Sequence, residues 1–385
     1  MLIDTLNKLF VAHKEVALSH RYITSKMIAP LLEKLPEIFD VKIIGNSVNG
    51  LSIHEINLGN GPKKIFMWSQ MHGNESTTTK AIFDILNTFI GHDLWSETIL
   101  KSCTIKIIPI LNPDGAEVFT RINANKVDLN RDAINLSQPE SVVLRNVFND
   151  FKPDFCFNLH GQRTIFSAGD TNNIATVSFL SPAEDATCMV TETRKKAMEV
   201  IAVMNAYLQT KIPNQVGVYD DSFNKNCVGD MFQTLKAPTI LFEAGHYKDD
   251  YAREKTRQYI YESIMVGLHK IATSKCDGSG YVPYNDIPEN GKLFYDIIIR
   301  DAAVFVEGEA VIKDIAILYK EVLVGGKVDF SPRIVKFSNL DGFFGHKEIN
   351  ANGYKVLGGN GGALEIDSEN DFVSINNELY SLKLT

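Results

Sequence analysis

The chain has 385 residues, of which 44% are hydrophobic and 22% are charged. This composition is typical of a globular protein with a sizeable core, and the length predicts one large domain plus a smaller one, or two to three domains. A formal net charge of −8, with basic residues scattered along the chain, disfavours both a nucleic acid and a membrane surface as a partner.

The N-terminal segment and the cysteines predict where the protein is found. The first twenty residues have no basic start, no apolar stretch and no small-residue cleavage site, so they do not resemble a signal peptide. No apolar run is long enough to span a bilayer. The five cysteines are odd in number and widely spaced, without a Cys-x-x-Cys pair, which is typical of reduced thiols. We therefore expect a cytoplasmic protein.

The first two-thirds of the chain alternates short apolar runs with amphipathic segments. Helical periodicity over residues 5–38 is followed by two expected strands around the turn between Asn46 and Gly50. Further strands are expected at 63–70, 104–111, 154–160 and 237–245, and helices at 76–91, 139–151, 191–210 and 252–273. This alternation predicts an α/β layered fold with a mixed or mostly parallel sheet.

The last third of the chain has a different character. Residues 274–292 are rich in glycine, proline and turn formers, which is typical of a linker. Beyond them, short alternating runs are separated by Gly, Asn and Asp, as in a small β-rich domain. The expected organisation is a catalytic domain over 1–273, a linker over 274–292 and a β-rich domain over 293–385.

Chemically capable residues follow the expected strands. The run 63–70 leads into His72 and Glu75, which stand three residues apart. The run 154–160 ends at His160, and the sequence TILF leads into Glu243. In open α/β sheets, ligands bind outside the carboxyl ends of the strands. We therefore expect these side chains to gather at one edge of the sheet.

Taken singly, each of these signals is weak. A His-x-x-Glu pattern arises by chance in a chain of this size, and a lone histidine after a strand is a structural hydrogen-bonding group in roughly two cases of three. Together they form the usual ligand set of a catalytic zinc, two histidines and one carboxylate, with an open position for water. A further carboxylate is needed to take a proton from that water, and Glu243, emerging from an apolar strand, is placed for a raised proton affinity.

The loop RINANKVDLNRD, residues 121–132, carries Arg121, Asn130 and Arg131 between turn formers. Guanidinium groups in such a setting suit carboxylates or oxyanions. The alternative is a solvated loop held by salt bridges, and charge alone favours that alternative.

The ordered set MHGNES, NPDG, R-x-N-A-N-x-V-D-L-N-R, NLHGQ and FEAG resembles the zinc carboxypeptidase family, over roughly residues 20–270. The resemblance implies a three-layer α/β/α fold with a central mixed eight-stranded sheet. It also implies one zinc per chain, with His72, Glu75 and His160 as its ligands.

The same resemblance implies roles for the remaining candidates. Arg121 would polarise the scissile carbonyl, and Asn130 and Arg131 would hold the terminal carboxylate of the substrate. Glu243 would act as general base and then as general acid. The family's mobile tyrosine is best matched by Tyr219, although its spacing to Glu243 differs, and the specificity position falls near Val228 or Gly229. DLNR is followed here by DA, where secreted digestive members commonly have NF.

Two alternatives remain open. Short HGNE and DLNR motifs also occur in the aspartoacylase and succinylglutamate desuccinylase group, whose members cleave N-acyl amino acids and carry a C-terminal β domain. The NPDG element and the spacing from Arg121 to Arg131 favour a peptidase instead. A catalytically silent carboxylate-binding protein is the other alternative, and the presence of every expected catalytic residue argues against it. We predict a metallocarboxypeptidase-like hydrolase that removes C-terminal residues from peptides.

Overall fold

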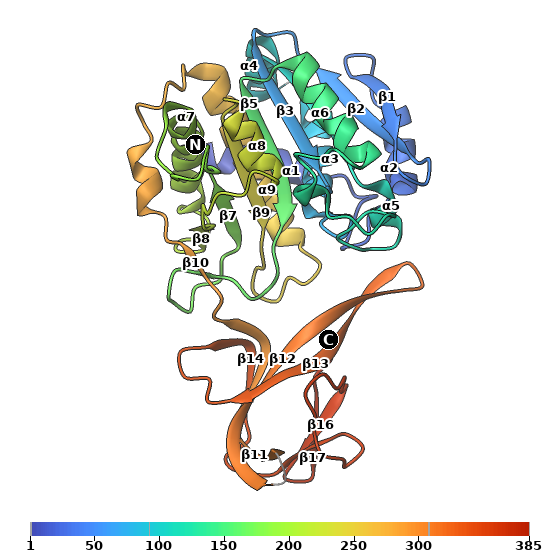
Figure 1. Ribbon diagram of the computed structural model, residues 1–385, viewed down its shortest axis with the longest axis vertical. Coiled ribbons are helices and arrows are strands. Elements are labelled where there is room, and N and C mark those ends of the chain that lie inside the picture. The colour runs from blue at the N-terminus through green and yellow to red at the C-terminus, as the bar shows by residue number, and fades with distance from the viewer. Residues whose placement is uncertain (1, 92, 307–308, 385) are drawn as a thin grey trace. The chain divides into compact units, whose positions relative to one another are not determined.

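The computed structural model describes residues 2–91, 93–306 and 309–384 (Figure 1). The chain forms two compact units. The first comprises Met1–Gln162 and Ala175–Asn290, and the second comprises Arg163–Ile174 and Gly291–Thr385.

The first unit is built on an eight-stranded sheet with the strand order β1-β2-β4-β3-β5-β9-β7-β8. The strands β4, β3, β5 and β9 run parallel to one another, whereas β1 and β2 join the β4 edge in antiparallel fashion and β7 runs antiparallel to β9. The sheet is therefore mixed, as the sequence predicted. The strands are β1 (Asp40–Asn46), β2 (Ser52–Leu58), β3 (Lys63–Ser69), β4 (Cys103–Ile108), β5 (Phe155–Gly161), β7 (Val177–Leu180), β8 (Val216–Val218) and β9 (Thr239–Ala244).

Helices cover both faces of this sheet, because successive residues of the central strands point to opposite faces. Ile65 and Met67 of β3 lie in a core shared with α1, α3, α7 and α9, whereas Phe66 and Trp68 pack with α6 and α8. The predicted three-layer α/β/α architecture is thereby confirmed. The helices are α1 (Leu2–His13), α2 (Ser25–Glu33), α3 (Thr77–Ile90), α4 (Leu94–Ser102), α5 (Pro113–Glu117), α6 (Pro139–Phe151), α7 (Glu192–Leu208), α8 (Val228–Thr234) and α9 (Glu254–Thr273), with 3-10 turns η1 (Leu129–Arg131) and η2 (Val282–Asp286).

The N-terminal region departs from its expected helical pattern. Residues 5–38 hold two helices rather than one continuous periodic segment, and α2 ends at Glu33. Pro36 follows within one turn, and the residue before a proline is disfavoured in a helix. Ile38, which extends the apolar periodicity in the sequence, is therefore outside the helix and 49% exposed.

The second unit is β-rich, as expected for the C-terminal part of the chain. Its four-stranded sheet has the order β13-β12-β11-β14, with β14 parallel to β11, and a separate sheet has the order β15-β16-β17. A two-stranded ladder joins β6 (Ser167–Ala168) to β10 (Asn290–Gly291). The other strands are β11 (Phe294–Val306), β12 (Glu309–Val324), β13 (Lys327–Ser338), β14 (Phe344–Asn350), β15 (Val356–Gly358), β16 (Phe372–Ile375) and β17 (Glu378–Ser381).

The segment expected as a linker is anchored to the first unit at several points. Cys276, Tyr284 and Ile287 are buried in the core of the first unit. Arg163–Ile174, by contrast, leaves the first unit directly after β5 and joins the second. Within the second unit, the carbonyl of Ile165 accepts a hydrogen bond from the Phe294 N–H.

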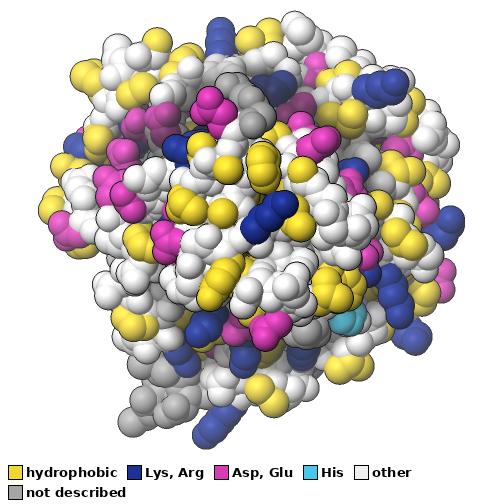
Figure 2. Space-filling model, turned by 90° about the horizontal axis from the view of Figure 1, so that it is seen from below, with side chains coloured by type: hydrophobic (Ala, Val, Ile, Leu, Met, Phe, Trp, Pro, Cys, Tyr) yellow, Lys and Arg dark blue, Asp and Glu magenta, His cyan; other side chains and the backbone are white. Residues whose placement is uncertain are grey.

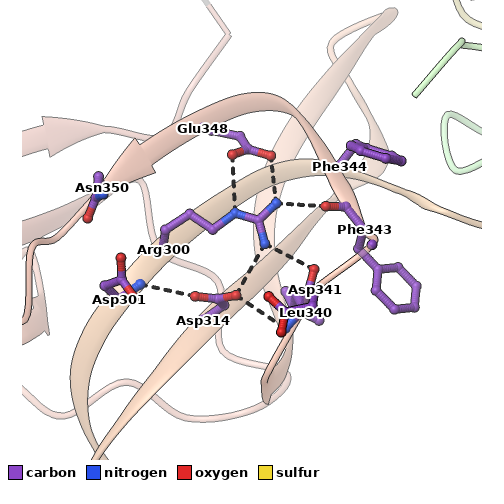
Figure 3. Close-up of a pocket in the computed structure, with 10 residues that line it drawn as sticks. Arg300, Asp301, Asp314, Leu340, Asp341, Phe343, Phe344, Glu348 and Asn350 are labelled. Atoms are coloured by element: carbon purple, nitrogen blue, oxygen red, sulfur yellow. Dashed lines mark hydrogen bonds and ion pairs between the residues drawn. The ribbon is translucent and has the colours of Figure 1, made fainter. Parts of the chain in front are cut away.

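The surface shown in Figure 2 has acidic, basic and apolar side chains interspersed. Among the residues that the structure describes, no helix has both the length and the apolar character needed to cross a bilayer.

Candidate active site

Three of the predicted residues converge at the carboxyl ends of β3 and β5. His72 Nδ1 lies 2.8 Å from Glu75 Oε1, and His160 Nδ1 lies 3.0 Å from Glu75 Oε2 and 3.1 Å from His72 Nδ1. Both histidines are only 2% exposed. The structure thus brings together two imidazoles and one carboxylate that lie 88 residues apart at most in the sequence.

The turn between β3 and α3 places His72 and Glu75 on the same side. The Glu75 N–H donates to the His72 carbonyl, and Gly161 N–H donates to Glu75 Oε2 at 2.9 Å, which links the turn to the end of β5. Gly73 is required here, because a Cβ at this position would lie 2.0 Å from the backbone carbon of Gly115. The close approach of two backbones therefore sets the geometry of the turn.

The motifs NPDG and IGNSVNG stabilise the neighbouring loops rather than the cluster itself. Asp114 accepts hydrogen bonds from Ser47 Oγ at 2.8 Å and from the Asn49 N–H at 3.1 Å. Glu140 is fully buried and accepts from Asn123 Nδ2 and the Val48 N–H. These contacts hold the loop that carries Arg121 against the first turn of the sheet.

Asp128 is a site residue to which the sequence interpretation gave no role, although it stands inside the quoted DLNR motif. Its Oδ1 lies 3.1 Å from His72 Nε2, and its Oδ2 accepts from Arg121 Nε at 3.0 Å. A carboxylate on the far nitrogen of a histidine fixes the ring and leaves Nδ1 free to bind a metal. Metal-binding histidines usually have a carboxylate or carbonyl partner on the second ring nitrogen, so such a partner could be expected. The sequence does not show which carboxylate contacts His72.

The charges of this cluster shift the pKa values of its members. Burial alone would lower the pKa of His72, but Glu75 and Asp128 raise it above its ordinary value. Burial would raise the pKa of Glu75, yet the two histidines hold it well below its usual range. Burial would likewise raise the pKa of Asp128, but His72 and Arg121 hold it below its ordinary value. Both carboxylates are therefore ionised, as ligands and their supporting groups must be.

Glu243 lies beside the cluster on β9. Its Cα is the register partner of His160 across the parallel pair β5–β9. Burial raises the pKa of Glu243 well above its ordinary value, and the nearby charge of Glu75 raises it further. Its Oε2 has no hydrogen-bond partner among the described residues. A carboxylate of this kind is suited to accept and return a proton.

Arg121 also reaches the cluster. Its Nη1 lies 3.4 Å from Glu75 Oε1, while its side chain remains 46% exposed. A cation that touches the rim and stays open to solvent can meet an oxygen of an incoming molecule.

Asn130 and Arg131 lie on η1, directly after Asp128. Asn130 Oδ1 accepts from the Val228 N–H at 3.0 Å, so its amide nitrogen is the end left for a ligand. Arg131 is exposed and donates from Nη1 to the Asn130 carbonyl at 2.8 Å. No contact within the described residues joins Arg131 to the His72–Glu75–His160 cluster.

Tyr219 lies close to the cluster, at the end of β8. Burial raises the pKa of its phenol, and the charges of Glu243 and Glu75 raise it further.

The donor set fits zinc. Bonds of 2.0–2.2 Å in a tetrahedral arrangement would place ligand atoms about 3.3 Å apart, close to the separations of 2.8–3.1 Å in the cluster. In the described part of the chain, the ligand atoms of His72, Glu75 and His160 lie close enough together to hold a metal ion.

Part of the chain is similar in sequence to known proteins. The sequence model for zinc carboxypeptidases matches residues 24–135. Probable carboxypeptidase 2 of Trichophyton verrucosum is 30% identical over 111 residues, which is 28% of this chain and 21% of that protein. The chain thus spans about a fifth of the length of this curated relative.

Solved structures share the fold of the chain. A metallo-carboxypeptidase from Burkholderia cenocepacia matches with a TM-score of 0.51 and 16% identity, covering 65% of this chain and 70% of the other. A metallo-carboxypeptidase from Pseudomonas aeruginosa, in complex with (2-guanidinoethylmercapto)succinic acid, matches with a TM-score of 0.53 and 17% identity, covering 65% and 69%. The chain is thus similar to zinc carboxypeptidases in sequence over residues 24–135, and it shares the fold of these metallo-carboxypeptidases over 65% of its length.

Proposed function

We propose that the protein is a zinc-dependent metallocarboxypeptidase that removes residues from the C-terminus of peptides. The observation that carries this proposal is the convergence of His72, Glu75 and His160, with Glu243 on the adjacent strand. One zinc per chain would be held by the first three side chains. When bound, zinc acts as a Lewis acid toward a carbonyl oxygen and lowers the pKa of water.

The remaining groups of the site have the chemistry that amide hydrolysis needs. Glu243 takes the proton from the attacking water, because burial raises the proton affinity of its carboxylate. It then gives that proton to the leaving amine, which would otherwise depart as an unstable anion. Arg121 donates to the carbonyl oxygen as negative charge develops there. Asp128 keeps the His72 ring in place throughout.

The substrate carboxylate would be bound at Asn130 and Arg131. A planar guanidinium grips a carboxylate through two parallel hydrogen bonds, and Arg131 is exposed for this purpose. The Pseudomonas aeruginosa neighbour is in complex with a succinic acid derivative, which has carboxylates of the kind that this anchor would hold. Tyr219 would close on the substrate from the side of Glu243.

The alternatives predict different substrates. An N-acyl amino acid deacylase would hydrolyse short N-acyl amino acids and exclude longer peptides, but the family match is to carboxypeptidases, so this alternative is not favoured. A silent carboxylate-binding protein would bind such compounds without turnover. The raised proton affinity of Glu243 beside an intact ligand set argues for an enzyme.

Two further assignments belong to this proposal. Residues 1–273 would form the catalytic domain, and residues 293–385 would form a separate β-rich domain after the segment 274–292. The protein would act in the cytoplasm, which is supported by free thiols at Cys103, Cys156 and three further cysteines in the described chain.

The proposed function is tested with the zinc-loaded protein and three substrates. These are a peptide with a free C-terminus, the same peptide amidated, and an N-acyl amino acid. We expect release of single residues from the free peptide only, and loss of this activity after chelation. Cleavage of the N-acyl amino acid alone would establish the deacylase, and binding without cleavage of any substrate would establish the silent protein.

A further inference from the structure

The loop 219–227, between β8 and α8, joins two parts of the proposed substrate site. At its start, the Tyr219 N–H donates to the Phe179 carbonyl at 3.0 Å, and the ring lies near Glu243. At its end, the first residue of α8, Val228, donates its N–H to Asn130 Oδ1. The position of this loop therefore decides the position of Tyr219 relative to the carboxylate anchor.

The middle of this loop is held by a buried guanidinium. Arg194 of α7 is 1% exposed, and its Nη2 donates to Asp221 Oδ2 at 2.6 Å. The Cys188 thiol also donates to the Asp221 carbonyl at 3.4 Å. Burial of a guanidinium is costly unless its N–H groups are bonded. The Asp221 side chain that accepts one of these N–H groups is 41% exposed, so the ion pair joins a buried cation to a carboxylate at the surface.

Arg194 also binds the segment 181–191, which connects β7 to α7. Its Nη1 donates to the carbonyl of Cys188 at 2.6 Å and to that of Met189 at 3.3 Å, and its Nη2 donates to that of Ser181 at 3.0 Å. One side chain thus ties the tyrosine loop to a second segment of the chain through several hydrogen bonds.

The segment 181–191 is in turn fixed to α8. The carbonyl of Glu184 accepts from Thr234 Oγ1 at 2.7 Å, and the Glu184 carboxylate forms an ion pair with Lys236. A Cβ on Gly229 would lie 3.1 Å from Pro182 Cγ, so α8 packs tightly against this segment. The loop, the segment and α8 form a closed set of contacts, in which Arg194 supplies the link to Asp221.

We propose that Arg194 and Asp221 are positioning residues, which hold the loop 219–227 so that Tyr219 stays beside Glu243 while α8 stays on Asn130. Their contribution to catalysis passes through Tyr219, and this inference rests on the proposed function. Loss of the ion pair would free the middle of the loop, and Tyr219 would then close on the substrate from a less defined starting position.

The kinetic test uses Asp221→Asn in the zinc-loaded, full-length protein. The matched control is Asp220→Asn, because Asp220 accepts hydrogen bonds from Ser222 within the loop itself. We expect Asp221→Asn to lower kcat/KM for a peptide with a free C-terminus by roughly 10- to 100-fold, as misplacement of a substrate-positioning group does. The control should stay within about twofold, since it leaves the link to Arg194 intact.

A double-variant cycle separates positioning from a merely structural role. In a Tyr219→Ala background, Asp221→Asn should cause no further loss of kcat/KM, because residues that act through one group are not additive. Equal losses in both backgrounds would overturn the inference, as would an Asp221→Asn variant with the kinetics of the unaltered protein.

Hydrogen exchange provides a readout that does not depend on activity. Asp221→Asn should speed amide exchange in residues 219–227 and leave the rest of the first unit as protected as in the unaltered protein. Asp220→Asn should leave the protection of residues 219–227 unchanged. Unchanged exchange in the loop, or a uniform rise across the first unit, would overturn the inference. If the unaltered protein cleaves no peptide, the proposed function fails, and this measurement alone decides whether Arg194 and Asp221 hold the loop.

Discussion

His160 and Glu243 are register partners on the adjacent parallel strands β5 and β9. This pairing places an imidazole, which is a proposed metal ligand, and an ionisable carboxylate side by side, at the same level of the sheet. Because both strands end there, the two side chains face the same edge, where His72 and Glu75 arrive from β3. The proposed base and His160 are thus positioned by the sheet, whereas His72 and Glu75 are positioned by the turn between β3 and α3.

Asp128→Asn is expected to weaken zinc binding. The variant keeps the shape of the side chain but loses the charge that orients His72 through Nε2. Loss of such a supporting carboxylate typically lowers metal affinity by about 10- to 100-fold. Titration against a competing chelator measures the change, with Asp220→Asn as the control. Equal affinities in all three proteins would remove Asp128 from the site.

Arg121→Ala is expected to lower kcat more than it raises KM. The oxygen that Arg121 would meet carries its full charge only in the transition state. Removal of one such donor costs roughly 10²–10³ in kcat. Steady-state kinetics on a peptide with a free C-terminus provides the measurement. A rise in KM with unchanged kcat would instead assign Arg121 to ground-state binding.

Arg131→Ala is expected to raise KM for peptides with a free C-terminus and to leave amidated peptides uncleaved, as in the unaltered protein. The reason is that the guanidinium would contact only the carboxylate, which amidation removes. Lys225→Ala, which removes another exposed cation, serves as the control for net charge. If free and amidated peptides are cleaved equally well by the unaltered protein, Asn130 and Arg131 are not a carboxylate anchor.

Asp230 of α8 predicts a pH dependence of stability. Burial raises its pKa to about 6, above the ordinary value near 3.8. Its contribution to stability is therefore fully present below about pH 4 and is lost as the pH rises through about 6, at up to about 1.4 kcal/mol for each unit of pKa difference.

Asp230→Asn removes this titration, so the variant should gain stability relative to the unaltered protein between about pH 4 and pH 6. Urea unfolding at several pH values measures the difference in the free energy of unfolding. If the difference in the free energy of unfolding between the two proteins is constant with pH, or changes in the opposite direction, the fold does not raise the pKa of Asp230.

The central strands and their terminal residues could be predicted because each strand crosses a hydrophobic layer. Short apolar runs such as 63–70 and 154–160 are typical of strands that are buried on both faces of a sheet. The first polar residue after each run marks the edge of the sheet. His72, Glu75, His160 and the strand preceding Glu243 follow from this pattern. Long amphipathic helices were equally clear, since α6 spans Pro139–Phe151, as expected.

Contacts between distant segments could not be predicted in the same way. Nothing in the sequence pairs Asp128 with His72, or Arg194 with Asp221, because a loop carboxylate has many possible partners. The composition of 274–292 indicates turns correctly but does not reveal that Tyr284 is buried. A truncation after Thr273 would therefore remove part of the core of the first unit, and the contact of Ile165 with Phe294 would be lost as well.

Glu243→Gln tests the proposed role of Glu243 as general base. The amide keeps the size of the side chain but cannot accept a proton from water. The variant should bind one zinc per chain, as measured by metal analysis, and should lose at least about 10²-fold in kcat on a peptide with a free C-terminus. Zinc binding with undiminished hydrolysis would contradict the assignment of Glu243 as general base, and with it the proposed mechanism.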